Sequence, residues 1–266
     1  MVRLFFTKRW LGYFALAIVF AIIASLFGMW QWDRRGQAVA AIERVENNFD
    51  RDPLSLERFL EENPIVDRDD EWIPVTVTGR YLAEEQILVR TRPRSGAVGF
   101  EVLVPLETTL GVFVINRGWI STGDSSDFPD MIPEAPDGVV SLVARVRPGE
   151  PELRGRGAPE GQIASIYLPA LAQMTGRELR EDFYLALGSE QPSVSVTPLP
   201  LERPQLDEGP HLSYTFQWYL FALMAIIGFL YMLRQELALQ RGDKRKDRVG
   251  TTDAEEEDAL LDKSAG

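Results

Sequence analysis

Two long apolar segments without a charge constrain this chain more than any other feature. They are residues 11–32, LGYFALAIVFAIIASLFGMWQW, and residues 214–233, YTFQWYLFALMAIIGFLYML. A helix needs about 20 mostly apolar residues to cross the hydrocarbon core of a bilayer. Tryptophan and tyrosine lie near the ends of both segments, which is typical of residues at membrane interfaces. The sequence therefore predicts two transmembrane helices, over 11–32 and 211–233.

The first segment has an alternative interpretation as a cleaved signal peptide. Lys8 and Arg9 precede the apolar residues, as they would in such a peptide. The segment is long, however, and it ends in Gly-Met-Trp-Gln-Trp instead of a cleavage site of small residues. We therefore expect a retained anchor.

Positive charge near the ends of the segments predicts the orientation. Both tails, 1–10 and 234–266, carry arginine and lysine close to the apolar residues. Cytoplasmic ends of transmembrane helices are enriched in these residues. We expect both termini in the cytoplasm and residues 33–210 outside the cell (plasma) membrane of a bacterium. The tail 234–266 is highly charged, and we expect it to be disordered.

Composition excludes several classes of function. The chain has no cysteine, so it has neither disulfides nor thiolate metal sites. Residues 36–210 contain 16 arginines, no lysine and 30 carboxylates, a formal net charge of −14. Such a surface repels nucleic acid. The segment RGRGAPEG, 154–161, matches no nucleotide-binding spacing and is predicted to be a surface loop. With one histidine and no GxSxG motif, the chain is not predicted to be an enzyme.

The segment between the helices has the alternating pattern of a β domain. Residues 33–49 can continue the first helix, and short helices are expected over 55–63 and 168–176. Runs of alternating apolar residues predict strands over 72–82, 86–91, 100–106, 112–120, 139–146, 183–187 and 193–196. The predicted class is an α+β membrane protein with a mostly antiparallel, small barrel-like outer domain.

The outer ends of the two predicted helices carry the candidate site. Antiparallel neighbouring helices bring the end of the first segment and the start of the second to the same height. His211, the only histidine, and Trp218 share one helical face. Gln31 and Gln217 lie in apolar surroundings, where polar side chains usually face another helix. The candidate residues are His211, Trp218, Trp30, Arg34 and Arg35; an ordinary anchor with interfacial aromatics and a capping histidine stays open as the alternative.

Four motifs give the chain a family resemblance. They are GMWQWDRR at the end of the first segment, VTVTGRY over 75–81, GFEVLVPLETTLGVFVINRGWI over 99–120, and HLSYTFQWYLFAL over 211–223. With them the chain resembles the Surfeit locus protein 1 (Shy-type) family of cytochrome c oxidase assembly factors, from about residue 10 to 234. The family has two membrane helices that flank an outer, mostly β domain, which agrees with the topology predicted above.

The resemblance implies a non-enzymatic assembly factor that delivers haem a to the catalytic subunit of the oxidase. His211 matches the family histidine that is implicated as the ligand of the haem iron. The resemblance suggests Arg34 and Arg35 as partners of the propionates, and Trp30 and Trp218 as packing surfaces for the ring. The implied partners are the oxidase catalytic subunit or a respiratory supercomplex, the enzyme of haem a synthesis, and membrane lipid.

Two points stay open at this stage. Family members commonly have asparagine before the histidine, whereas this chain has Gly209-Pro210, so the orienting partner of the imidazole is missing from its expected place. The alternative function is a structural or accessory subunit that docks to the oxidase without haem. For Asn116–Trp119, the NRGW segment, we expect a structural role: a buried tryptophan, a glycine at a bulge, and an arginine paired with the acidic surface.

Overall fold

The structure is a computed structural model that describes residues 6–124 and 128–264, with side chains described up to residue 240. The chain forms two compact units. One unit consists of the residues up to Val39 and those from Asp207 onward, and the other is Ala40–Leu206. Each unit is described by itself below.

The first unit is built from two helices: α2, Lys8–Asn48, whose residues up to Val39 belong to this unit, and α5, His211–Ser264. Helix α2 continues past the first apolar segment, as residues 33–49 predicted. Helix α5 also continues, to Ser264, where the sequence analysis expected a disordered tail. Alanine, leucine, glutamate, lysine and arginine are strong helix formers, so a charged composition did not by itself predict loss of helix.

Both helices are long and apolar enough to cross a membrane. The qualifying helices are Lys8–Asn48, with a mean hydropathy of 2.3 in its most apolar part, and His211–Gln240, with 1.8. A core helix of a soluble protein can have the same composition, but it is mostly buried. Here only 11% of each apolar window is buried, so most of this apolar surface has no protein partner among the described residues.

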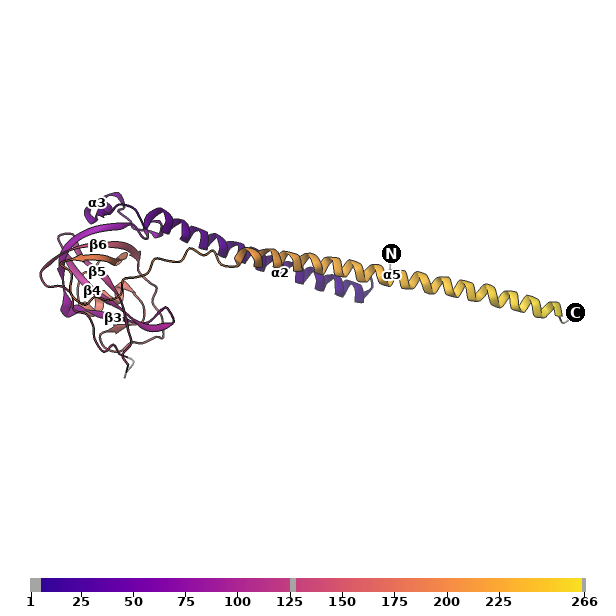
Figure 1. The fold of residues 1–266 in the computed structure, drawn as a ribbon. Coiled ribbons are helices and arrows are strands. Elements are labelled where there is room, and N and C mark those ends of the chain that lie inside the picture. Colours follow the sequence, from indigo (N-terminus) through magenta and orange to yellow (C-terminus); the bar gives the residue numbers. More distant parts are fainter. Residues whose placement is uncertain (1–5, 125–127, 265–266) are drawn as a thin grey trace. The chain divides into compact units, whose positions relative to one another are not determined.

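Helices α2 and α5 pack side by side in antiparallel directions (Figure 1). Near one end of the pair, Trp10 lies edge-on to Phe229, with ring centroids 6.0 Å apart. Further along, Gly28 allows close approach, because a Cβ atom there would lie 3.1 Å from the ring of Tyr219. Ala24, one turn away on the same face, is also buried. Small residues four apart are typical of close helix pairs in membranes.

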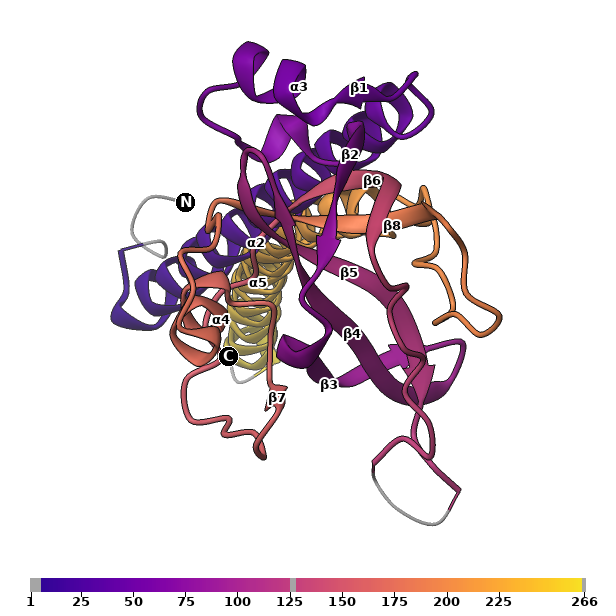
Figure 2. The ribbon, with the colours of Figure 1, turned by 90° about the vertical axis from the view of Figure 1, so that its left-hand side faces the viewer.

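The second unit contains a closed ring of five strands. Strand β2 pairs with β6, β6 with β8, β8 with β5, β5 with β4, and β4 pairs back to β2 (Figure 2). These strands are β2 Pro74–Tyr81, β4 Ala97–Thr108, β5 Gly111–Ser121, β6 Val139–Pro148 and β8 Phe183–Gln191. Strand β3, Ile87–Arg94, extends the sheet beside β4, and the two-residue strands β1, Leu54–Ser55, and β7, Gln162–Ile163, complete it. The short helical elements are α3 Leu56–Glu62, η1 Arg68–Asp70, η2 Ala83–Glu85 and α4 Leu168–Thr175.

The sheet is mixed, so the expectation of a mostly antiparallel sheet was wrong. Strands β5 and β8 are parallel neighbours, as are β1 with β2 and β3 with β7. The reason is topological. A closed ring with an odd number of strands cannot alternate direction all the way round, so at least one neighbouring pair must be parallel. The sequence suggested closure into a barrel but gave no sign of a parallel pair. Closure of five strands requires at least one such pair.

Apolar side chains fill the unit on both sides of the strands. Along β4, Val102, Val104 and Leu106 belong to one buried cluster, and Leu103 between them belongs to another. Helix α4 contributes Leu168 and Leu171 to this second cluster. Because both faces of β4, β5 and β8 are covered here, these strands have nearly continuous apolar sequences instead of strict alternation.

One of the predicted strands is absent. Residues 193–196, SVSV, form no strand, and Val196 is 46% exposed. Pro192, Pro198 and Pro200 flank this segment. Proline has no N–H to donate to a sheet, so alternation alone was misleading at this position.

The NRGW segment contains a bulge and a buried ion pair. The register between β4 and β5 shifts so that Val102 is opposite Gly118 and Leu103 is opposite Asn116, which leaves Arg117 as the extra residue. Gly118 has φ +129°, and a Cβ there would lie 2.3 Å from the carbonyl oxygen of Leu199. The predicted bulge glycine and buried tryptophan, Trp119, are confirmed.

The expectation that Arg117 pairs with the acidic surface was wrong. Arg117 is only 1% exposed, and its Nη2 donates to Glu190 Oε1 at 2.8 Å, while Nη1 donates to the carbonyl of Pro133 at 3.0 Å. Tyr81 donates its hydroxyl hydrogen to the other oxygen of Glu190, at 3.0 Å. Burial, followed by the negative charge of Glu190, raises the pKa of Tyr81 well above its ordinary value, which keeps the hydroxyl a donor. A buried arginine needs such partners, and Glu190 lies 73 residues away in the sequence.

The end of α2 is fixed to the β domain within the second unit. Asn48 is 4% exposed, and its Nδ2 donates to the carbonyls of Asp69 and Glu71 at 2.7 and 2.8 Å. Next to it, the Phe49 ring lies 3.8 Å from the Arg145 guanidinium. These contacts attach the last turn of α2 to the rest of the second unit.

We expect Asn48→Ala to lower the free energy of unfolding by about 1–2 kcal/mol, because a buried side chain that donates two hydrogen bonds to backbone carbonyls is lost. Chemical unfolding of the full chain in detergent, followed by tryptophan fluorescence, measures this change. The matched control is Asn47→Ala, since Asn47 is exposed and is expected to change stability by less than about 0.5 kcal/mol. Equal effects of the two substitutions would contradict this role of Asn48.

Candidate functional site

The facing surfaces of α2 and α5 bring His211 and Gln31 together. His211 is the first residue of α5, and its Nδ1 lies 2.8 Å from Oε1 of Gln31 on α2. An amide oxygen only accepts hydrogen bonds, so Nδ1 carries the hydrogen and Nε2 of the neutral ring carries the free lone pair. The prediction that Gln31 faces another helix is confirmed, whereas Gln217 is exposed.

A glycine, Gly209, lies next to the His211 ring on the side of Nε2. Gly209 has φ +69°, and a Cβ atom at this position would lie 3.5 Å from Nε2. That distance is an ordinary van der Waals contact, so the positive φ is what favours glycine at this position. On the other side of His211, its carbonyl accepts a hydrogen bond from the hydroxyl of Thr215 at 2.9 Å, and Thr215 is 3% exposed. The backbone carbonyl and Nδ1 of the histidine thus both have partners, and Nε2 has no hydrogen-bond partner among the described residues.

The two candidate tryptophans have different environments. Trp218 is half-buried and stacks on Phe27 of α2, with ring centroids 4.8 Å apart and planes at 24°. Trp30 is 50% exposed. No ring contact joins Trp30 to Trp218 among the residues that the structure describes. Trp218 therefore belongs to the helix contact, and Trp30 offers a free surface.

An apolar groove runs along α2 beside Trp30. It is lined by Ile23, Leu26, Phe27 and Trp30 and has a volume of about 350 Å³. Phe27 and Trp30 lie within about one helical turn of Gln31. An apolar surface and the imidazole therefore occur in the same stretch of the helix pair.

The two candidate arginines also differ. Arg34 is exposed, and its guanidinium donates to Gln37 at 3.1 Å and lies 5.6 Å from the ring of Trp30. Arg35 Nη2 contacts Glu208 Oε2 at 2.8 Å. The guanidinium group of Arg35 is thus already paired with a carboxylate of the chain itself. Arg34 has unused donors for an external carboxylate, so it is the better candidate of the two.

The structure adds residues that the sequence analysis did not place in the site. Gln31 had a signal, since a polar side chain in an apolar segment indicates a helix contact, but its partner was unknown. The only signal for Gly209 in the sequence was its position two residues before His211. Glu208 and Phe27 had no signal, because their partners, Arg35 and Trp218, are defined by the fold.

Asn116 and Arg117 of the NRGW segment belong to the packed interior, whereas Trp119 lines a cavity at the surface of the domain. Asn116 donates from Nδ2 to Glu101 Oε2 at 2.8 Å, and Arg92 lies 3.5 Å from the same carboxylate. Burial raises the pKa of Glu101, although the positive charge of Arg92 and the hydrogen bond from Asn116 act in the opposite direction. Asn116 thus has a partner within the packed domain, which agrees with the structural role expected for this segment.

No group of three or more histidine, aspartate or glutamate side chains that could hold a metal ion occurs among the described side chains, those of residues 6–124 and 128–240.

The fold and site define a class: a small barrel inserted between two apolar helices whose facing sides carry a histidine–glutamine pair. The model of the SURF1 family matches residues 17–223 of the chain. The chain belongs to the SURF1 family.

Relatives from bacteria and eukaryotes support this assignment. An uncharacterised SURF1-like protein of Mycobacterium tuberculosis is 32% identical over 252 residues, which cover 92% of this chain and 91% of the relative. A SURF1-like protein of Rickettsia conorii is 19% identical, over 85% of this chain and 92% of the relative. The cytochrome oxidase assembly protein SHY1 of Saccharomyces cerevisiae is 30% identical over 110 residues, which cover 40% of this chain and 28% of that protein.

Proposed function

We propose that this chain is a membrane-bound assembly factor for cytochrome c oxidase that holds haem a for the catalytic subunit. Family membership supports the assembly role, as does the similarity to a yeast protein named for oxidase assembly. The single observation that carries the haem assignment is the 2.8 Å contact between Nδ1 of His211 and Gln31. This contact leaves Nε2 free to act as an axial ligand.

The residues of the helix pair fit a haem. Haem supplies an iron with an axial position for neutral imidazole, an apolar ring and two carboxylates. His211 would bind the iron, Trp30 and the groove beside it would contact the ring, and Arg34 would pair with a carboxylate. Trp218 would act indirectly, because it already packs on Phe27. Arg35 would keep the Glu208 segment in place instead of binding the propionate.

Gln31 replaces the partner that the asparagine before the histidine would supply in other family members. In this chain the orienting group comes from α2 instead of from the residue next to His211. The consequence is that the imidazole is oriented only while the two helices are paired. Helix pairing and ligand orientation are therefore coupled.

We place α2 and α5 across the plasma membrane of a bacterium, with both termini in the cytoplasm. The positive charges of the tails and the largely unburied apolar windows support this placement. His211, Gln31, Trp30 and Arg34 then lie near the outer interface, where an apolar ring is buried in lipid and carboxylates remain near water. The chain has no catalytic role in this proposal.

Complementation of a bacterial strain that lacks its own family member tests this function. The strain is expected to have less haem a per oxidase catalytic subunit, measured from reduced-minus-oxidised spectra and immunoblots. The wild-type chain should restore the ratio, and His211→Ala should restore it only in small part. Ser213→Ala, in the same exposed turn of α5, should behave as wild type.

Two results would refute parts of the proposal. An unchanged oxidase in the deletion strain would refute the assembly role. Full restoration by His211→Ala would refute haem binding and favour the alternative, a protein that docks to the oxidase without haem.

A further inference from the structure

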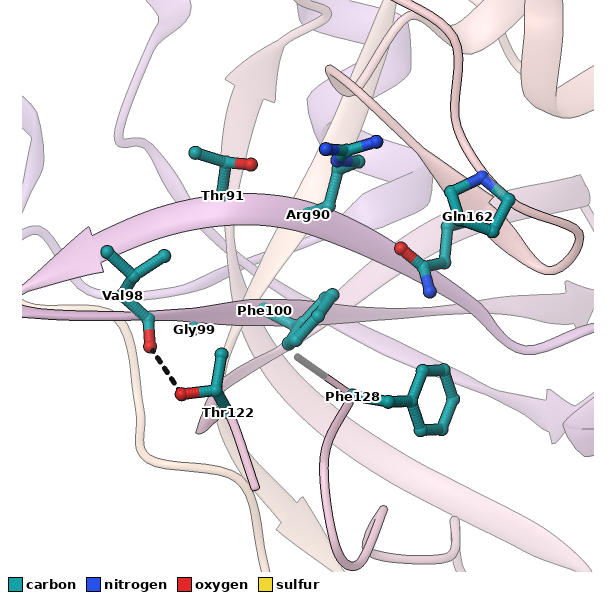
Figure 3. Close-up of a pocket in the computed structure, with 9 residues that line it drawn as sticks. Arg90, Thr91, Val98, Gly99, Phe100, Thr122, Phe128 and Gln162 are labelled. Carbon is teal, nitrogen blue, oxygen red and sulfur yellow. Dashed lines mark hydrogen bonds between the residues drawn. The ribbon is translucent and has the colours of Figure 1, made fainter. Parts of the chain in front are cut away.

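Two adjoining cavities open on the β domain beside strand β3. The larger, of about 780 Å³, is shown in Figure 3 and is lined by Arg90, Thr91, Val98, Gly99, Phe100, Thr122, Phe128, Pro159 and Gln162. The smaller, of about 270 Å³, is lined by Arg90, Thr91, Arg156, Gly157 and Ala164. Because they share Arg90 and Thr91, we treat them as one surface, the arginine groove. Their sizes are in the range of ligand-binding pockets.

A bulge in β3 directs two successive side chains toward the groove. The register with β4 shifts between Val89 and Arg92, and Thr91 has φ +60°. Arg90 and Thr91 are both exposed, and Figure 3 shows them on the same side of the strand. A left-handed backbone is rare for a β-branched residue, and such outliers are concentrated at binding and active sites.

The two arginines of the groove lack acidic partners. Arg90 donates one hydrogen bond, to the carbonyl of Gly157 at 3.1 Å. Among the described residues, no carboxylate lies within 4.0 Å of Arg90 or Arg156. Some other arginines of the same domain, such as Arg92, contact one, whereas the exposed Arg80 contacts none of the described carboxylates. What distinguishes Arg90 and Arg156 is that both line one pair of adjoining cavities with donors that an external anion can use.

The other wall of the groove is apolar. Phe100 and Phe128 lie with ring centroids 6.3 Å apart, and Val98 is 52% exposed. Thr122 and Gln162 also line the larger cavity and offer hydrogen-bonding groups. A ligand that fills the groove therefore needs a negative group at one end and an apolar group a short distance away.

We propose that the arginine groove binds an extended acidic segment of a partner protein. Carboxylates of the segment pair with Arg90 and Arg156, since guanidinium matches carboxylate in bidentate geometry. A neighbouring apolar side chain of the segment packs against Phe100 and Phe128. This inference requires neither haem nor His211, so it stands or fails separately from the proposed function.

Selection from a random peptide library against the full chain in detergent tests the proposal. The wild-type chain should enrich peptides that combine Asp or Glu with an aliphatic or aromatic residue. Arg90→Glu/Arg156→Glu should fail to enrich them. A selected peptide, synthesised with a fluorescent label, should bind Arg90→Ala about ten-fold or more weakly than wild type by anisotropy.

Controls separate the groove from charge in general. Arg80→Ala removes another exposed arginine, from β2 and outside the groove, and should leave the affinity unchanged. All variants should unfold at the wild-type temperature, because the substituted side chains are exposed. The proposal is overturned if the wild-type chain enriches no acidic peptides or if Arg80→Ala weakens binding as much as Arg90→Ala. It is also overturned if phosphatidylglycerol vesicles or inorganic phosphate displace the peptide at comparable concentration, which would indicate a lipid or a bare-anion site.

Discussion

Arg117→Ala is expected to lower the free energy of unfolding by about 3–5 kcal/mol, because it leaves a buried carboxylate without its counter-charge. The Glu190 side chain, which is 4% exposed, would keep only the hydrogen bond from Tyr81. The carbonyl of Pro133 would lose its donor, and the removed guanidinium would leave a cavity. Chemical unfolding of the full chain in detergent provides the measurement.

Two further variants identify the cause of that loss. Arg80→Ala removes an exposed arginine from the residue next to Tyr81 and should change stability by less than about 0.5 kcal/mol. Arg117→Met/Glu190→Leu removes both charges and should be more stable than Arg117→Ala, since the cost comes from the unpaired charge. A loss below about 1 kcal/mol for Arg117→Ala would show that this ion pair does not hold the barrel together.

Local patterns were sufficient to predict most elements of the fold. Strands β2 to β6 and helices α3 and α4 follow from apolar periodicity and from capping residues such as Ser55 and Gly176. Closure of the ring depends on the pairing of Tyr81 with Leu106 and of Ile115 with Leu185. Such pairings join residues far apart in the chain, so the direction of β8 relative to β5 had no local signal.

Side-chain partners were harder to predict than elements, for the same reason. The NRGW pattern indicated a bulge because glycine has few other uses within a strand. The pattern did not indicate that Glu190 would neutralise Arg117. Because the surface carries many carboxylates, the sequence analysis expected one of these as the partner of Arg117 instead. Likewise, the pairs Arg35–Glu208 and His211–Gln31 join residues more than 170 positions apart, and only the paired helices bring them together.

His211→Ala is expected to abolish stable binding of haem by the purified chain, because the axial nitrogen is lost. After co-expression with haem a synthesis, the wild-type chain should show a Soret band and the low-spin signature of an imidazole-bound iron. The variant should show neither, while it unfolds at the wild-type temperature, since a half-buried side chain at a helix start adds little packing. Equal haem in both proteins, or none in either, would refute His211 as the ligand.

Gln31→Leu separates a positioning role from a general effect on the helix pair. Leucine preserves the size of the side chain but cannot accept the hydrogen from Nδ1. Loss of an outer partner of a metal-bound histidine typically weakens metal affinity by about 10–100-fold, so Gln31→Leu should bind haem with reduced affinity but not lose it. Gln31→Glu keeps an acceptor and should recover much of the affinity. Gln217→Leu, at an exposed position of α5, is the matched control and should bind as wild type.

The same set of variants tests the arginine assignment. Arg34→Ala should weaken haem binding less than Gln31→Leu, because it removes one exposed ion pair, which contributes about 1 kcal/mol or less. Arg35→Ala should instead release Glu208 and affect the segment that leads to Gly209 and His211. If Gln31→Leu bound haem as tightly as wild type, the imidazole would not need its partner on α2. The coupling between helix pairing and ligand orientation would then be wrong, even if His211 remained the ligand.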